Sequence, residues 1–216
     1  MLLVTPTLVT ERLRLRPFAD SDADQLFALQ SDANVLRYWD SPPWTEESQA
    51  KQFIARSREM AEEGSGVRMV IERGETTGVR SSGELARPLA PSEGVTARSA
   101  DDGAFLGWCT LNSWNPDFRS ASLGYCLGEA AWGRGVATEA AKQLLGWAFD
   151  TLDLNRVQAE ADTRNAGSAR VLEKLGFTLE GTLREDCVVN GVVSDSWVFG
   201  LLRREWFARQ PGTAGT

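Results

Sequence analysis

Hydrophobic and polar residues follow two periods along this chain, and these periods separate strands from helices. Alternation of apolar and polar residues with period two is clearest within residues 11–16, at Leu13 and Leu15, and within residues 157–162, at Val157, Ala159 and Ala161. Further strand-like segments lie at residues 67–72, 105–113, 120–127, 177–189 and 192–202. The dipeptide Asn190-Gly191 joins the last two segments and predicts a tight hairpin turn.

Apolar residues at helical spacing predict four helices, at about residues 21–35, 45–60, 137–148 and 165–175. The third is the most regular, because its apolar residues recur at i, i+3, i+4 and i+7: Ala137, Ala140, Ala141, Leu144, Leu145 and Ala148. These segments predict a single α+β domain over residues 1–216, with a mixed sheet of about seven strands and about four helices. Residues from about 74 to 103 show little periodicity and are predicted to form a mobile surface insertion.

The turn before the third helix carries the strongest chemical signal. Trp132, Gly133, Arg134 and Gly135 lead directly into Val136, Ala137 and Thr138. Bare glycine backbone lets a bulky anion approach, and the first amides of a helix have no acceptor within it. The helix dipole adds about half a positive charge at the same point, so the turn suits a phosphate group. A glycine-rich helix start that binds nothing is the alternative.

Composition excludes several classes of protein. The net charge is −7 without a long basic run, which argues against a nucleic-acid partner and favours an amine-bearing one. The chain has no histidine, so the commonest general base is missing, and no metal-ligand spacing is present. No apolar run approaches the ~20 residues of a membrane span, and the first residues lack the features of a signal peptide. A cytoplasmic protein without a bound metal or a membrane contact is expected.

Four motifs occur in order along the chain. They are residues 123–127 (Leu-Gly-Tyr-Cys-Leu), residues 132–140, Asn165 with Ser168, and residues 172–177 followed by Glu180-Gly181. Together they resemble the GNAT superfamily of acyl-CoA-dependent N-acyltransferases. The resemblance is strongest to the RimJ/RimL-type branch, which contains ribosomal-protein N-terminal acetyltransferases, and it covers nearly the whole chain. The resemblance implies a GNAT fold in which two central strands splay apart.

The resemblance also implies a binding site for acetyl-CoA. It implies that the turn and helix start hold the diphosphate of coenzyme A, through Trp132, Gly133, Arg134, Gly135, Val136, Ala137 and Thr138. The strand with Tyr125, Cys126 and Leu127 would pair with the pantetheine arm, and Asn165 would contact the cofactor from the next helix.

The implied reaction is direct attack of an amine on the thioester in a ternary complex. The backbone N–H near Leu127 is the implied oxyanion donor. Leu172 stands where many superfamily members have a tyrosine acid, and Ser168 occupies the place of the serine of the RimL-like branch. The resemblance therefore implies that Ser168 is the general acid and also contacts the cofactor. A helix-start hydroxyl that satisfies backbone groups is the alternative for Ser168.

The general base is where the chain departs from the branch. Cys187 occupies the position of the branch's glutamate. Glu185, on the same predicted strand face, is the candidate base, and Asp186, which is expected to point the other way, and a chain of water molecules are the alternatives. Glu160 and Asp162 lie on the polar side of their strand and are expected to face solvent.

Three functions remain open at this point. The first is an acetyl-CoA-dependent N-acetyltransferase acting on a peptide N-terminus or another primary amine. The others are an acyltransferase using a longer donor such as succinyl-CoA, and a non-catalytic acyl-CoA sensor. Trp39, Trp44 and the 74–103 segment are expected to line the acceptor cleft, and a homodimer contact through the two tryptophans is the alternative.

Overall fold

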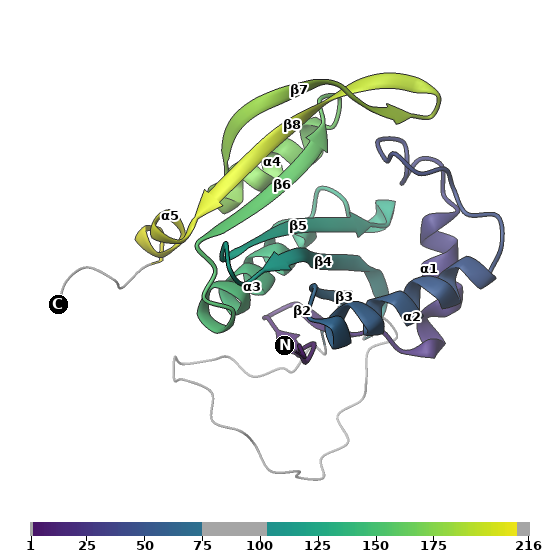
Figure 1. Cartoon of the computed structure of the whole chain (residues 1–216). Helices are drawn as coiled ribbons and strands as arrows, with labels where there is room; N and C mark the ends of the chain where they lie inside the picture. The colour runs from purple at the N-terminus through teal and green to yellow at the C-terminus, as the bar shows by residue number, and fades with distance from the viewer. Residues whose placement is uncertain (1, 75–102, 211–216) are drawn as a thin grey trace, which may run out of the picture.

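A computed structural model describes residues 2–74 and 103–210. It contains one mixed sheet with strand order β1-β2-β3-β4-β5-β6-β8-β7 (Figure 1). The strands are β1 (Leu8–Val9), β2 (Leu13–Pro17), β3 (Val67–Arg73), β4 (Phe105–Asn115), β5 (Ser120–Leu127), β6 (Arg156–Asp162), β7 (Thr178–Val189) and β8 (Val192–Leu202). The helices are α1 (Ala23–Gln30), α2 (Ser48–Glu63), α3 (Val136–Thr151), α4 (Ala166–Leu175) and α5 (Arg203–Ala208).

The predicted α+β architecture is confirmed. All seven expected strands are present, and the eighth is β1, whose two residues are too short to give a periodic signal. The hairpin between β7 and β8 turns at Asn190 and Gly191, which have φ values of 51° and 78°, as a type I′ turn requires. The predicted insertion at about 74–103 lies, apart from its two end residues, outside the described residues.

The central pair of strands separates partway along its length. β5 and β6 are parallel, and their pairing is confined to Ser120–Ser122 opposite Arg156–Gln158. Beyond Ser122, β5 continues for five more residues to Leu127 without a β6 partner in the described structure. The expected splay of two central strands is therefore present.

The alternation of side chains gives the sheet two separate cores. Val70, Trp108 and Cys126 project to the face covered by α1 and α2. Met69, Cys109, Leu111 and Leu123 project to the opposite face, where α3 and α4 pack. Trp39 and Trp44 are half-buried in the first core, with ring centroids 5.5 Å from Trp108 and 5.6 Å from Phe53 respectively.

The apolar stripe of α3 packs as predicted. Ala140, Ala141, Leu144, Leu145 and Ala148 are all buried against the sheet. The helix begins at Val136, so its start is fixed close to the end of β5 by the short 3-10 turn Glu129–Ala131 and the glycine-rich turn that follows. Packing of this stripe therefore positions the helix N-terminus beside the splayed strands.

The expectation that Asp162 faces solvent is wrong, whereas Glu160 is exposed as expected. Asp162 is 6% exposed because it ends β6 where α4 and β8 close over the strand. Its carboxylate accepts hydrogen bonds from Arg164 Nε at 2.8 Å, Arg164 Nη2 at 2.6 Å and Ser194 Oγ at 2.7 Å. The bonds from Arg164 and Ser194 outweigh the effect of burial and lower the pKa of Asp162 to about 2.

The carboxylate of Asp162 should make the free energy of unfolding depend on pH. Since the folded pKa of about 2 is below the unfolded value of about 4, Asp162 contributes about 2 kcal/mol above pH 4, and this is lost as the pH falls from about 4 to 2. Urea unfolding of the wild type and Asp162→Asn at pH 7, 4 and 2.5 should show a difference in unfolding free energy that narrows below pH 4. A difference that stays constant from pH 7 to 2.5 would contradict this prediction. The control is Glu160→Gln, because Glu160 is an exposed acid on the same strand.

Candidate active site

The turn before α3 has the backbone geometry of an anion site. Gly133 and Gly135 have φ values of 68° and 77°, in the left-handed region that favours glycine. Gly135 is the N-cap residue of α3 and has no side chain with which to cap it. The amides of Val136, Ala137 and Thr138 therefore lack acceptors within the helix and lie at the positive end of its dipole. A Cβ at Gly133 would meet no atom within 4 Å, so the turn is open on that side.

Trp132 ties this turn to the end of β5. Its indole Nε1 donates to the carbonyl of Leu127 at 2.8 Å. The Arg37 guanidinium, from the segment between α1 and α2, lies 5.0 Å from the centroid of the Trp132 ring. The tryptophan thus holds the glycine-rich turn, the splayed strand and the α1–α2 segment in one place.

The free backbone groups of β5 face the gap left by β6. The Gly128 N–H donates to the Leu106 carbonyl at 3.0 Å, which makes these two residues a hydrogen-bonded pair across β4 and β5. Hydrogen-bonded and non-hydrogen-bonded pairs alternate in an antiparallel ladder, so the N–H and C=O of Leu127 and Tyr125 point away from β4. The same alternation turns the backbone of Cys126 toward β4, and its side chain is buried in the α1–α2 core.

Two hydroxyl groups meet across this gap. Tyr125 Oη on β5 lies 2.9 Å from Ser168 Oγ in the first turn of α4. Burial raises the pKa of Tyr125 to about 12, so its hydroxyl stays protonated near neutral pH. The Asn165 side chain caps α4 by accepting the Ser168 N–H at 3.0 Å. The α4 N-terminus is therefore capped by Asn165, and the Ser168 hydroxyl is paired with Tyr125.

The sequence predicted each of these residues separately and missed the pairing of the two hydroxyls. Residues 125 and 168 are linked by no local pattern, and only the sheet order brings β5 and α4 together. The available signal was the alternation of β5, which places Tyr125 on the opposite face from Cys126.

Glu185 does not follow the strand geometry used to place it. The register between β7 and β8 shifts between Leu183 and Cys187, and Glu185 within this bulge has a φ of 54°. Its N–H donates to Asp195 Oδ1 at 2.8 Å, and the residue is exposed. The regular alternation that was used to put Glu185 and Cys187 on one face does not hold here, because the bulge interrupts it.

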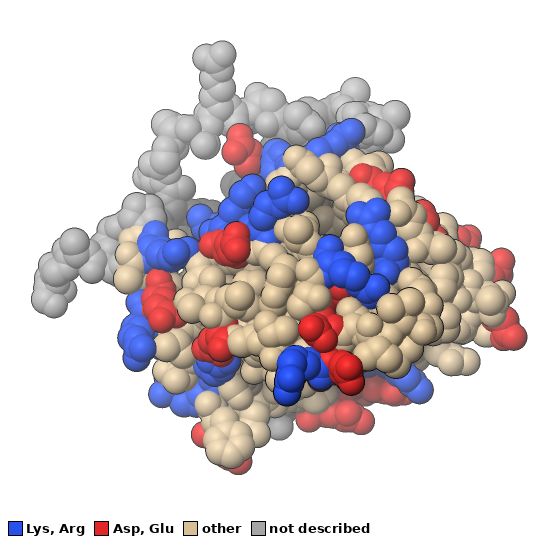
Figure 2. Space-filling view, turned by 90° about the horizontal axis from the view of Figure 1, so that it is seen from above, with Lys and Arg blue, Asp and Glu red and all other residues tan. Residues whose placement is uncertain are grey.

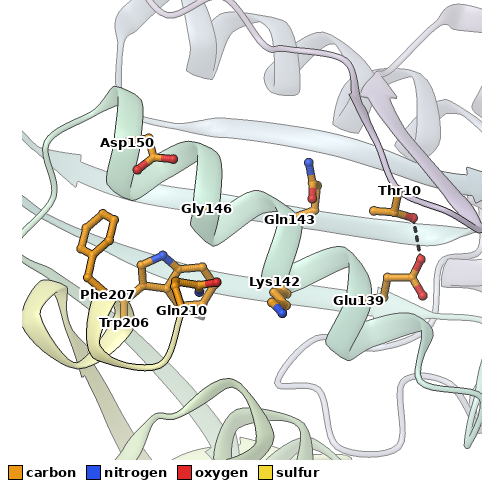
Figure 3. A pocket seen from close by; sticks show the side chains of 9 residues that line it. All are labelled: Thr10, Glu139, Lys142, Gln143, Gly146, Asp150, Trp206, Phe207 and Gln210. Carbon is orange, nitrogen blue, oxygen red and sulfur yellow. Dashed lines mark hydrogen bonds between the residues drawn. The ribbon is translucent and has the colours of Figure 1, made fainter. Parts of the chain in front are cut away.

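Two surface hollows lie along α3, away from the paired hydroxyls. The larger, of about 390 Å³, is formed mainly by α3 and α5, and its lining includes Glu139, Lys142, Trp206 and Gln210 (Figure 3). The smaller, of about 250 Å³, shares Lys142, Trp206 and Gln210 and extends to Thr138 at the helix start. Thr138 thus belongs both to the start of α3 and to the lining of the smaller hollow.

Three further observations concern the surface charges, the metal-ligating side chains and the hydropathy of the helices. Figure 2 shows basic and acidic side chains interspersed over one face of the molecule. Within residues 2–74 and 103–210, no group of three or more His, Cys, Asp and Glu side chains is arranged to hold a metal ion. None of the helices in this part of the chain is long and apolar enough to cross a bilayer.

Comparison with known proteins places the chain in a family. Residues 12–178 match the family model of the acetyltransferase (GNAT) domain. The uncharacterized N-acetyltransferase p20 of Bacillus licheniformis is 33% identical over 200 residues, which cover 93% of this chain and 98% of that protein. The putative ribosomal N-acetyltransferase YdaF of Bacillus subtilis (strain 168) is 36% identical over 120 residues, covering 56% of this chain and 66% of YdaF.

A solved structure agrees in fold. Spermidine N-acetyltransferase from Vibrio cholerae, in complex with CoA and spermine, superposes with a TM-score of 0.71 at 19% identity, covering 92% of this chain and 99% of that one. The family model, the relatives and the splayed sheet agree with one another. The chain therefore belongs to the GNAT acetyltransferase family, in keeping with its RimJ/RimL-type motifs, and is an acetyl-CoA-dependent N-acetyltransferase.

Proposed function

We propose that the chain transfers the acetyl group of acetyl-CoA to a primary amine by direct attack within a ternary complex. The observation that carries this proposal is the end of β5–β6 pairing after Ser122, which leaves backbone groups of β5 open to a ligand beside the start of α3. The pantetheine arm would pair with Tyr125 and Leu127 as an extra strand. The diphosphate would accept hydrogen bonds from the amides between residues 133 and 138.

The backbone of Leu127 supplies the donor for the tetrahedral intermediate. Its N–H faces the gap by the alternation of the β4–β5 ladder, and its carbonyl is already occupied by the indole of Trp132. A fixed backbone donor aimed at a developing oxyanion contributes about 3 kcal/mol to the barrier reduction. This role requires the thioester carbonyl to lie in the gap beside Leu127.

Ser168 protonates the departing thiolate, and Tyr125 orients the Ser168 hydroxyl. When Tyr125 Oη donates to Ser168 Oγ across their 2.9 Å contact, the serine's own proton is free to point into the gap. The high pKa of Tyr125, about 12, keeps this donor intact at neutral pH. At residue 172, where many superfamily members have a tyrosine, this chain has a buried leucine that cannot donate a proton.

Glu185 is the proposed acceptor of the proton lost by the amine. It is exposed to solvent, and the hydrogen bond that holds this residue comes from its backbone N–H to Asp195, so that bond does not fix the carboxylate toward an amine. The enzyme therefore depends on an acceptor amine of which a substantial fraction is already unprotonated at neutral pH. An N-terminal α-amine, with a pKa near 8, is about one-tenth neutral at pH 7, whereas a lysine with a pKa of about 10.4 is neutral below about one part in a thousand.

A peptide N-terminus is thus the acceptor that the site supports best, and the relative YdaF is named a putative ribosomal N-acetyltransferase. A polyamine is the second candidate. Spermidine N(1)-acetyltransferase of Escherichia coli (strain K12) is 23% identical over 202 residues, and the net charge of −7 favours a cationic acceptor.

Removal of the proposed acid should affect chemistry and not donor binding. Ser168→Ala should lower kcat about a hundredfold, in the range expected for loss of a general acid, and leave the Kd for acetyl-CoA within about twofold. Release of the CoA thiol and calorimetric titration measure the two quantities. Ser48→Ala, at the exposed start of α2, is the matched control. Wild-type turnover by Ser168→Ala would contradict the assignment.

The acceptor class can be tested by the pH dependence of turnover. We expect kcat/KM at pH 7 to be higher for a peptide with a free N-terminus than for the same peptide with a blocked N-terminus and one lysine, because more of the α-amine is neutral. Between pH 6 and 10 the turnover rate should increase with pH for both peptides, and this increase should begin at a lower pH for the α-amine than for the lysine. Faster turnover of the lysine peptide or of spermidine at pH 7 would contradict the proposal.

A further inference from the structure

An arginine remote in sequence reaches the back of the glycine-rich turn. Arg12, just before β2, donates from Nε to Glu139 Oε2 at 2.8 Å and also from Nη2 to the same carboxylate oxygen. Its Nη1 donates to the carbonyl of Arg134 at 3.3 Å. A Cβ on Gly135 would lie 3.7 Å from Arg12 Nη2, so the guanidinium packs beside the residue that starts α3.

The carboxylate held by Arg12 lies close to the proposed diphosphate site. Glu139 is in the first turn of α3, and its N–H donates to the carbonyl of Gly135 at 3.0 Å. Its Oε1 accepts a hydrogen bond from Thr10 Oγ1 at 2.5 Å, the contact drawn in Figure 3. Burial acts to raise the pKa of Glu139, but hydrogen bonds from Thr10 and Arg12 outweigh it and lower the pKa. Glu139 is therefore ionised at neutral pH.

An ionised carboxylate at this position opposes anion binding unless its charge is compensated. Like charges a few ångströms apart repel, and the helix dipole that would attract a diphosphate also attracts Glu139. The guanidinium of Arg12 contacts both the carboxylate and the Arg134 carbonyl of the turn. It therefore compensates the charge and also fixes the peptide between the two glycines.

We propose that Arg12 is a positioning residue for the acyl donor, which compensates Glu139 and holds the turn so that its amides face the diphosphate. This inference rests on the proposed diphosphate site. Arg12 acts through the turn, at a distance from the reacting thioester. Its side chain is 55% exposed, and exposed ion pairs add little to folding stability, so its main effect is on donor affinity.

The test compares acetyl-CoA with S-acetylpantetheine, which carries the same thioester arm without phosphates. Arg12→Gln should raise the Kd for acetyl-CoA about tenfold and change kcat/KM for S-acetylpantetheine by less than twofold. The double variant Arg12→Gln/Glu139→Gln should regain most of the lost affinity, because the uncompensated charge is gone. The midpoint of urea unfolding should stay close to that of the wild type.

Arg14→Gln is the matched control, since Arg14 is a neighbouring arginine that pairs with Glu72 at 3.2 Å instead of Glu139. It should leave the Kd for acetyl-CoA unchanged. An equal effect of Arg12→Gln on both donors, no effect on either, or no recovery in the double variant would overturn the inference.

The same experiment separates this inference from the proposed function. If the wild-type enzyme uses S-acetylpantetheine as efficiently as acetyl-CoA, the proposal that the turn binds the diphosphate fails. If the wild type prefers acetyl-CoA and Arg12→Gln keeps that preference undiminished, the diphosphate site stands and only the role of Arg12 fails.

Discussion

Hydrogen bonding between β5 and β6 lasts for three residues and then stops. Backbone N–H and C=O groups that lose a strand partner must be satisfied by water or by a ligand. Two helices of one layer hold the strands apart, because α3 follows β5 and α4 follows β6, and both pack on the same face of the sheet. The gap is therefore built into the packing of the fold, and the site follows from it.

The groups proposed to bind the acyl donor and to protonate its thiolate lie along this gap. At one end, the glycine-rich turn presents helix-start amides, held from behind by Arg12 and tied to β5 by Trp132. Across the gap, Tyr125 and Ser168 bring two hydroxyls together from elements that the sheet order makes neighbours. Each group is fixed by backbone or by packing, so little rearrangement is needed when the donor enters.

Local patterns predicted what local forces determine. Period-two segments became strands, the stripe on α3 became its buried face, and Asn190-Gly191 became the hairpin turn. The six-residue α5 was missed because it is too short to show a period. Family motifs then supplied the site residues themselves.

Contacts between distant segments were not predictable in this way. Asp162 is buried because β8 and α4 close over the end of its strand, and Glu185 is turned by a bulge that alternation cannot reveal. Arg12 with Glu139, and Tyr125 with Ser168, are pairs that only the folded topology creates.

A crystal structure of the enzyme with acetyl-CoA tests the central claim most directly. The account predicts diphosphate oxygens at about 2.7–3.2 Å from amide nitrogens between residues 133 and 138, and a pantetheine arm hydrogen-bonded to β5 where β6 has separated. A donor bound only in the hollows beside α5, with the gap beyond Ser122 unoccupied, would contradict it.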